Sequence, residues 1–422
     1  MKRGHHFAHR PFINYAREGP MAFGSSIDQR KTSKCNHLID IFRRHGTLSK
    51  AMARSLSGYS MDTVISIFNS LRKQKIIRQS EGRQKSKGRK AEFYTLNEGH
   101  SLYLGVTFNQ SGIHSATVSF SNRVLDRRFT PLPHGIGRKK FETTLAGHVG
   151  EALRASDNEG RRVSSVGISV PGDIDLRSGV LNSYIYMPAL RNITFSKILP
   201  GAVNGGTIMV DHNIRGMSSY AIHEIEGIAS CERTLFVSAR SGVAHSIIAG
   251  GAVITGRGDL GHVRVSDEKV RCDCGRSGCL DCYFSYRGFK ELYIEKVQGK
   301  KKAGVEIPRQ IILDALAKAF TEKKGPLYGE LEKRLLYFTT ALMDAANITA
   351  PERIVLSGEL LALYGEPVAE IQRLVSMRFP DTGYVSHFGR ARMSYHDLGT
   401  EIAAIGICFD LIKRDWGYES AG

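Results

Sequence analysis

The sequence lacks several features that mark whole classes of protein. No apolar run approaches the ~20 residues that a membrane-spanning helix needs, and the N-terminus has no apolar segment of the kind found in secretory signals. Seven cysteines in 422 residues are too few for a disulfide scaffold, and we find no short internal repeat or low-complexity segment. The remaining composition, 41% hydrophobic and 24% charged, is that of a folded globular protein. We therefore expect a cytoplasmic protein of two or three domains without a membrane partner.

Acidic residues are scarce at the start of the chain. The first 100 residues hold 20 Lys and Arg against 7 Asp and Glu, a net charge of +13. The whole chain has a net charge of +18, so the other 322 residues carry only +5. A basic segment joined to a nearly neutral body predicts a polyanionic partner for that segment. A solubilising tail is the alternative, but the segment has a folded pattern.

That pattern is typical of a winged helix-turn-helix domain at residues 28–98, preceded by a mobile basic arm at residues 1–27. Apolar spacing predicts three helices, over residues 34–44, over residues 50–56 and from residue 61 onward. Ser57, Gly58 and Tyr59 form a tight turn between the second and third helices, which is the helix-turn-helix arrangement. Two strand-like runs follow, at residues 76–78 and 93–96.

The third helix is the candidate for reading DNA. Its apolar spacing predicts that Val64, Ile65, Phe68 and Leu71 are buried. A major groove admits one helix, whose polar side can then contact base edges. The residues that we expect to face DNA are Ser60, Met61, Thr63, Ser66, Asn69 and Arg72.

A flexible basic wing lies between the two strand-like runs, at residues 80–90. Its cations are Arg83, Lys85, Lys87, Arg89 and Lys90. We expect them to contact phosphates or a minor groove, which adds affinity that depends on salt but does not read sequence. A helix-turn-helix can also be a protein-interaction module. The turn, the polar third helix and the basic wing together favour double-stranded DNA as the partner.

The remaining residues, 99–422, have the pattern of two α/β lobes. Strand-like runs such as residues 163–170 alternate with helical stretches such as residues 141–156 and 400–416. Alternation of this kind predicts an α/β fold with mixed sheets.

The sharpest motif of the chain is a cluster of metal-binding residue types at residues 259–282. The candidate ligands are His262, Cys272, Cys274 and Cys279. Three thiolates and one imidazole are a common ligand set of closed structural zinc sites, and thiolates favour Zn²⁺ over Mg²⁺ or Ca²⁺. We therefore expect one structural Zn²⁺ per chain. Cys282 leaves open a second ligand set of four cysteines without His262, and disulfides or free thiols are further alternatives.

This cluster and its surroundings resemble the ROK family (repressors, open reading frames and kinases). The family pattern is Glu-x-Gly-His, a spacer, then Cys-x-Cys-Gly-x-x-Gly-Cys-x-Glu, which compares with residues 259–262 and 272–281 here. Residues 166–175 resemble the family's strand and Pro-Gly-x-x-Asp turn, and residues 351–358 resemble its late strand-to-glycine turn. The basic head ending in Gly88-Arg89-Lys90 resembles the repressor branch. The resemblance implies a two-lobed, actin-like ATPase body and favours His262 over Cys282 as the fourth zinc ligand.

The kinases of the family transfer phosphate from ATP to a sugar, and three parts of their machinery differ here. Their first phosphate loop, Asp-x-Gly-Gly-Thr, corresponds to residues 107–111, which lack the Asp and both glycines. Their second loop, Gly-Thr-Gly-x-Gly, corresponds to residues 240–244, which keep one glycine. Their catalytic Asp corresponds to Asn213, and an amide is not a base. A shift of one residue would make Asp211 the base without restoring the loops. We therefore expect no ATP and no enzyme activity.

The sugar pocket of the family is retained in part. The resemblance implies that the corresponding residues are His212, Asn213, Asp259, His262 and Asp281. Asp259 and Asp281 each replace a Glu, which keeps an acceptor for a sugar hydroxyl but shortens the carboxylate by one methylene. The pocket is expected to bind a sugar or sugar derivative, or nothing.

Together these expectations describe a transcriptional regulator, most simply a repressor of carbohydrate genes. It would be a homodimer or a dimer of dimers, bound to operator DNA and so associated with the nucleoid. The alternatives are a ROK sugar kinase that phosphorylates a hexose with ATP, and a ligand-independent DNA-binding or interaction scaffold.

Overall fold

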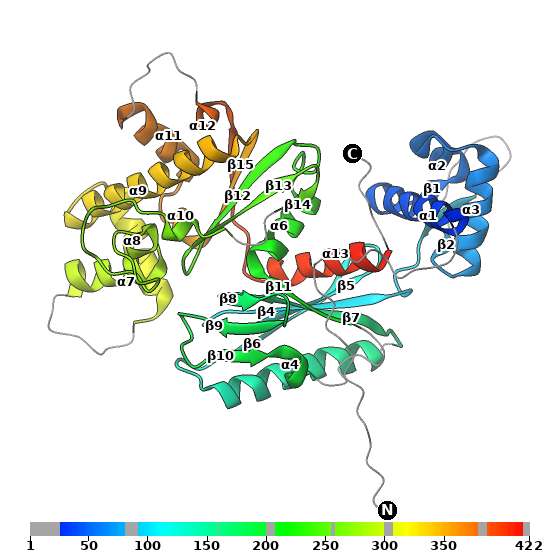
Figure 1. The fold of residues 1–422 in the computed structure, drawn as a ribbon, viewed down its shortest axis with the longest axis horizontal. Coiled ribbons are helices and arrows are strands. Elements are labelled where there is room, and N and C mark those ends of the chain that lie inside the picture. The colour runs from blue at the N-terminus through cyan, green and yellow to red at the C-terminus, as the bar shows by residue number, and fades with distance from the viewer. Residues whose placement is uncertain are drawn as a thin grey trace, which may run out of the picture. The chain divides into compact units, whose positions relative to one another are not determined.

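The computed structural model describes residues 26–80, 92–158, 160–199, 207–254, 258–298, 307–378 and 386–416 (Figure 1). Most of the expected basic arm and all five wing cations fall outside these ranges. The chain divides into two compact units. Unit 1 comprises Met1–Gly216 and Ala403–Ala421, and unit 2 comprises Met217–Ile402. The sheets of both units mix parallel and antiparallel pairs, which confirms the predicted α/β class.

The first part of unit 1, called the head here, comprises the described residues between 26 and 96. Its elements are α1 (Ser26–His45), β1 (Leu48–Ser49), α2 (Lys50–Ser57), α3 (Met61–Lys73), β2 (Ile77–Ser80) and β3 (Phe93–Leu96). The strands form an antiparallel sheet in the order β1-β3-β2. Helix α2 ends at Gly58, whose φ of +70° closes the helix, and the Ser60 hydroxyl accepts a hydrogen bond from the Thr63 amide at the start of α3. The predicted turn between these helices is therefore present.

The core of the head is formed by α1, α3 and β3. Phe68 of α3 lies 5.5 Å from the ring of Phe42 and 5.2 Å from the ring of Tyr94, centroid to centroid. The prediction that Ile65 is buried is wrong, because its side chain is 37% exposed and Ile67 is buried instead. The buried positions 64, 67, 68 and 71 follow the i, i+3, i+4, i+7 spacing of one helix face, and residue 65 lies outside that stripe.

The rest of unit 1 is built on a five-stranded sheet in the order β11-β7-β4-β5-β6. The strands are β4 (Leu102–Phe108), β5 (Gly112–Ser119), β6 (Val124–Pro131), β7 (Val163–Val170) and β11 (Thr207–His212). Figure 1 shows α4 (Arg138–Asn158) and α13 (Ile402–Trp416) on opposite faces of this sheet. Helix α13 approaches β4 so closely that a Cβ at Gly105 would lie 1.7 Å from the Ala404 carbonyl oxygen. A smaller sheet comprises β8 (Asp173–Asp175), β9 (Val180–Ser183) and β10 (Arg191–Thr194), and the short helix α5 (Phe195–Ile198) follows it.

An aromatic cluster, called the head joint here, attaches the head to the rest of unit 1. Trp416, at the end of α13, lies 4.5 Å from Phe120 and 5.3 Å from His100, centroid to centroid. The Trp416 indole N–H donates to the Tyr103 hydroxyl at 3.0 Å. On the head side, Arg43 of α1 donates to the Phe120 carbonyl at 3.0 Å and stacks on its ring. The C-terminal helix therefore contributes to the contact that holds the N-terminal head.

Unit 2 is built on a second five-stranded sheet, in the order β14-β13-β12-β15-β16. Its strands are β12 (Arg233–Ala239), β13 (Val243–Ala249), β14 (Ala252–Val253), β15 (Arg353–Ser357) and β16 (Arg392–His396). Its helices are α7 (Tyr286–Tyr293), α8 (Arg309–Glu322), α9 (Pro326–Thr349), α10 (Glu359–Ala362), α11 (Pro367–Arg378) and α12 (His387–Arg390). Short helical turns are η1 (Leu260–His262), η2 (Leu280–Cys282) and η3 (Ile294–Gln298), and α6 (Asn213–Glu224) crosses from unit 1 into unit 2.

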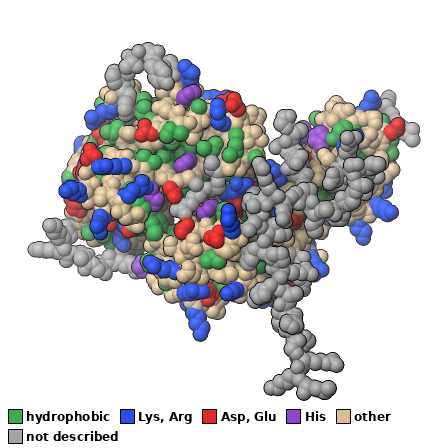
Figure 2. Space-filling model, viewed as in Figure 1, with side chains coloured by type: hydrophobic (Ala, Val, Ile, Leu, Met, Phe, Trp, Pro, Cys, Tyr) green, Lys and Arg blue, Asp and Glu red, His purple; other side chains and the backbone are tan. Residues whose placement is uncertain are grey.

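The surface is mixed in charge. In Figure 2, Lys and Arg side chains are interspersed with Asp and Glu over the visible face, without one large patch of a single sign. This agrees with the small net charge of the residues after the first 100. Among the helices in the described ranges, none has both the length and the apolar character needed to cross a membrane.

Candidate nucleic-acid interface and metal centre

The exposed side of α3 carries most of the residues expected to face DNA. Ser60, Ser66, Asn69 and Arg72 are exposed, and Met61 and Thr63 are half-buried. Ser60 and Thr63 also serve the helix itself, since their hydroxyls lie 2.9 Å apart and cap α3. The Arg72 guanidinium lies 5.8 Å from the Tyr94 ring, on the sheet side of the helix. Ser66 and Asn69 therefore keep the clearest outward polar positions among the predicted residues.

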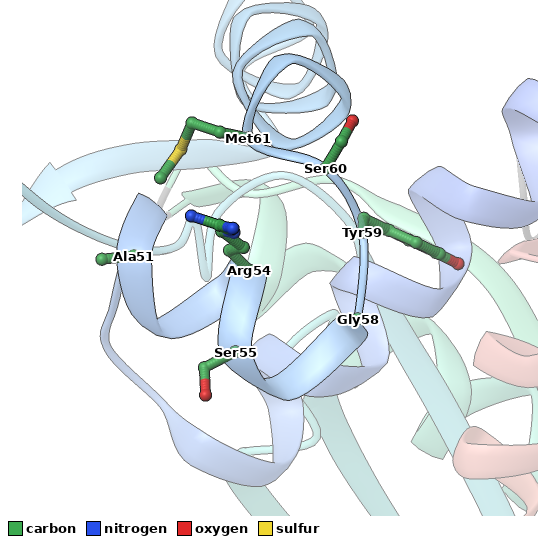
Figure 3. Close-up of a pocket in the computed structure, with 7 residues that line it drawn as sticks. All are labelled: Ala51, Arg54, Ser55, Gly58, Tyr59, Ser60 and Met61. Carbon is green, nitrogen blue, oxygen red and sulfur yellow. The ribbon is translucent and has the colours of Figure 1, made fainter.

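A hollow of about 650 Å³ lies beside the start of α3 (Figure 3). The residues that line it are Ala51, Arg54, Ser55, Gly58, Tyr59, Ser60 and Met61. Figure 3 shows the Arg54 side chain of α2 extending toward Met61, whereas the Tyr59 ring points away to the other side. The Tyr59 hydroxyl instead lies 2.8 Å from Nδ1 of His37. The sequence analysis did not include Arg54 among the residues expected to face DNA, although its position as a cation shortly before the turn was a signal for that role.

The five wing cations fall within residues 81–91, which lie outside the described ranges. The two ends of that segment are placed. Ser80, the last residue of β2, pairs with Phe93, the first residue of β3. The basic segment therefore connects two antiparallel strands that pair with each other, which is the position of a wing.

The four candidate metal ligands come together in unit 2. Their ligand atoms, the Sγ atoms of Cys272, Cys274 and Cys279 and a ring nitrogen of His262, all lie within 4.8 Å of one another. The Sγ atoms of Cys274 and Cys279 are 3.6 Å apart, and Cys272 Sγ is 3.5 Å from His262 Nδ1. Tetrahedral zinc with Zn–S bonds of ~2.3 Å separates its sulfur ligands by about 3.8 Å. The ligand types and spacing therefore fit a metal ion.

Glycines allow the cluster to form. Gly275 has a φ of +88° and donates its amide to the Cys272 carbonyl at 2.9 Å, which closes the turn between the first two cysteines. A Cβ at Gly278 would lie 2.0 Å from the Ser266 carbonyl oxygen, so only glycine fits there. The chain can pass this point and bring Cys279 back toward His262.

The cysteines differ in their electrostatics. Burial raises the pKa of Cys272. For Cys274, burial acts in the same direction, but hydrogen bonds from the backbone and side chain of Arg276 outweigh it and bring the pKa to about 7. Cys274 is therefore readily a thiolate, the form that binds metal. Cys282 lies next to the cluster, where its thiol donates to the Val270 carbonyl, and it is not among the four converging ligands.

The two carboxylates of the expected sugar pocket lie beside this cluster. Asp281 accepts a hydrogen bond from the Val243 amide at 2.9 Å. Burial raises its pKa to about 7, and the nearby negative charge of Asp259 adds to the rise. A Cβ at Gly261 would lie 2.2 Å from the Asp281 carboxylate, so glycine lets the His262 turn pack against it.

A residue that sequence reasoning missed, His245 of β13, also lies here. Its ring packs against Gly258, where a Cβ would be 2.2 Å from the ring. Burial lowers its pKa, while the neighbouring Asp259 acts in the opposite direction, and its buried Nδ1 has no hydrogen-bond partner among the residues that the structure describes. The signal was a histidine immediately after residues 240–244, the expected second phosphate loop.

The other two expected pocket residues belong to unit 1. His212 ends β11 and Asn213 begins α6. The preceding residue, Asp211, is 2% exposed and forms an ion pair of 3.0 Å with Arg215. Burial raises the pKa of Asp211 to about 7, while Arg215 lowers it. Asp211 is thus paired with Arg215 inside unit 1.

Two segments were matched to the kinase phosphate loops by resemblance, and the structure shows the local contacts of each. The Asn109 side chain accepts hydrogen bonds from the amides of Ser111 and Gly112 at 2.8 and 3.1 Å, which closes the turn between β4 and β5. In unit 2, Arg240 is half-buried, and burial lowers the pKa of its guanidinium although Glu359 and Asp397 oppose that shift. A large cation thus stands where the family has a glycine.

Comparisons with known proteins agree with this architecture. The xylose repressor of Bacillus spizizenii is 21% identical over 369 residues, covering 84% of this chain and 90% of the repressor. The glucokinase of Halalkalibacterium halodurans is 22% identical over 270 residues, covering 61% of this chain and 79% of the kinase. The crystal structure of a ROK family transcriptional regulator, a homologue of the E. coli MLC protein, shares the fold with a TM-score of 0.73 and 16% identity, covering 92% of this chain and 98% of that one. The ROK family itself matches residues 116–407, well over half of the sequence, and the chain therefore belongs to the ROK family.

Proposed function

We propose that this ROK protein is a DNA-binding transcriptional regulator, most simply a repressor of carbohydrate genes. The observation that carries the proposal is the arrangement of helices in the head. Its helices α2 and α3 meet at the capped turn around Gly58, and α3 presents polar side chains opposite its buried stripe. In this proposal the head is a winged helix-turn-helix in which α3 enters the major groove and the segment between β2 and β3 is the wing.

The proposed contacts fall into two classes. Ser66 and Asn69, on the outward side of α3, read base edges, and an Asn side chain suits adenine. Arg54 beside the hollow and the five wing cations bind phosphates, which positions the head without reading sequence. A homodimer would place two such heads on two half-sites of an operator.

The metal cluster supports a second part of the proposal, that a sugar effector controls DNA binding. Asp259 precedes His262 by three residues, and Asp281 follows Cys279 by two. A Zn²⁺ ion bound by His262 and Cys279 would therefore fix both carboxylates that accept hydrogen bonds from a sugar. The xylose repressors among the relatives favour a sugar as the effector. Binding of the effector would change the spacing of the two heads, which weakens operator binding because half-sites demand a fixed separation.

The kinase alternative makes a different prediction. We expect purified protein to show no sugar-dependent ADP production over a panel of hexoses and pentoses, measured by a coupled assay. We expect the same of Asn213→Asp, because that change restores a base but neither phosphate loop. Sugar-dependent ADP production by the wild-type protein would contradict the regulator as the sole function, and production by Asn213→Asp alone would show that the altered loops still support phosphoryl transfer.

The proposal is tested by binding of the purified protein to a library of its own genomic fragments at several salt concentrations. We expect a palindromic site bound at least about 1,000-fold more tightly than random DNA. A sugar panel on that site then identifies the effector as the sugar that releases the protein. Weak, salt-sensitive binding without preference for any fragment would refute the regulator.

A further inference from the structure

We propose that Ile65 of α3 is a specificity residue that contacts the methyl group of a thymine in the operator. The inference rests on the proposed function, since it names a base that the head reads. It follows from a side chain that the apolar pattern of the sequence assigns to the core and that the structure places on the surface.

Ile65 is not part of the head core. The buried stripe of α3 consists of Val64, Ile67, Phe68 and Leu71, and Ile65 is 37% exposed. The head core comprises fifteen fully buried residues with Cys35, Tyr59 and Trp416 packed against them, and Ile65 belongs to neither group. This large apolar side chain is therefore available for a contact on the element proposed to enter the groove.

Ile65 lies within the proposed reading surface of α3. Of the residues three and four positions away on the helix, Phe68 is buried and Met61 is half-buried, so Ile65 borders the buried stripe; on its other side lie Asp62 and Asn69. Both are exposed, and so is Ser66, the next residue. Ile65 is also the fifth residue of the thirteen in α3, within the N-terminal half that contacts base edges in helix-turn-helix proteins. The polar residues that would read bases therefore lie beside it.

The chemistry of the major groove gives an apolar side chain one preferred partner. Among the four bases, only thymine presents a methyl group along this edge, where all four present hydrogen-bonding groups. Burying Ile65 against a hydrogen-bonding edge would leave a base donor or acceptor without a partner, which costs free energy. Burying it against the thymine methyl removes two apolar surfaces from water. Each half-site should therefore contain a thymine opposite Ile65.

The test uses operator DNA in which each thymine in turn is replaced by uracil, which lacks only the methyl group. For the wild-type protein, replacement of one particular thymine per half-site should weaken operator binding about fourfold per half-site. This is the effect of one buried methyl-sized group. Ile65→Ala should bind the thymine and uracil operators equally well. Ile65→Val keeps a branched apolar side chain and should keep most of the preference.

Controls separate this inference from its alternatives. Ile348→Ala removes an isoleucine that is 84% exposed on α9, far from the head in sequence, and should retain the wild-type preference for thymine. Thermal melting should show that Ile65→Ala is folded, as expected for loss of an exposed side chain. If Ile65→Ala keeps the full preference for thymine, or if no thymine matters to the wild type, the inference is wrong. If the wild type has no specific site, the proposed function is refuted and the inference falls with it.

Discussion

A Cys279→Ser chain is expected to be purified without zinc and with a markedly less stable unit 2. Cys279 is 1% exposed and its thiol lies 3.6 Å from that of Cys274, so it is the most buried ligand of the cluster. Structural zinc contributes directly to folding free energy, and its loss should cost at least about 3 kcal/mol, or roughly 10 °C in Tm for a unit of this size. Elemental analysis measures the zinc, and melting followed by circular dichroism measures the stability. Wild-type protein stripped with a chelator should melt like the variant.

Two matched cysteine variants make this prediction specific. Cys231→Ser changes a buried cysteine outside the cluster and should keep one zinc per chain. Cys282→Ser changes the cysteine beside the cluster and should also keep its zinc, whereas His262→Ala should lose it. Zinc loss from Cys282→Ser together with retention by His262→Ala would show that the metal is bound by four cysteines instead.

Neutralising the wing is expected to have the largest effect on DNA binding. The variant replaces Arg83, Lys85, Lys87, Arg89 and Lys90 with glutamine. Each phosphate contact contributes ~0.9 to the slope of log affinity against log salt, so five lost contacts per head should flatten the slope by about 4.5 per head. Affinity at physiological salt should fall at least about 100-fold, to a similar extent for operator and random DNA, because phosphate contacts carry no sequence information. Titrations at four or more salt concentrations measure both quantities.

A control with the same change in net charge is available on the body. Lys139, Lys140, Lys318, Lys323 and Lys324 are all exposed, and their replacement by glutamine should leave the salt slope nearly unchanged. If this control loses as much affinity as the wing variant, the effect comes from total charge rather than from a wing. If the wing variant loses affinity for the operator alone, the wing reads bases.

The sequence predicted the elements that have strong local signals. The turn before α3 needs a glycine with positive φ and a capping serine, and the sequence contains both, as Gly58 and Ser60. The cysteine and histidine spacing likewise predicted the cluster in unit 2, and the family resemblance chose His262 over Cys282 as the fourth of the residues that converge there. The small sheet of β8, β9 and β10 was not predicted, because its strands are three or four residues long and carry little periodicity.

Other features depend on tertiary contacts that local patterns do not encode. Whether Ile65 or Ile67 of α3 is buried depends on where α1 and β3 pack, and the apolar composition is the same in both cases. Asp211 could be weighed as a base from the sequence, but its ion pair with Arg215 is visible only in the fold. The packing of His245 against Gly258 joins two segments thirteen residues apart through a bridge between them.

The division of the chain has a consequence for its synthesis on the ribosome. All residues of unit 2 have been translated by Ile402, whereas unit 1 needs α13, whose Ala404 lies against Gly105 and whose Trp416 completes the head joint. During translation the sheet of unit 1 therefore lacks one of its covering helices until α13 emerges. A nascent chain can therefore fold unit 2, with its candidate metal ligands, before α13 is made, and its head becomes anchored only once α13 is in place.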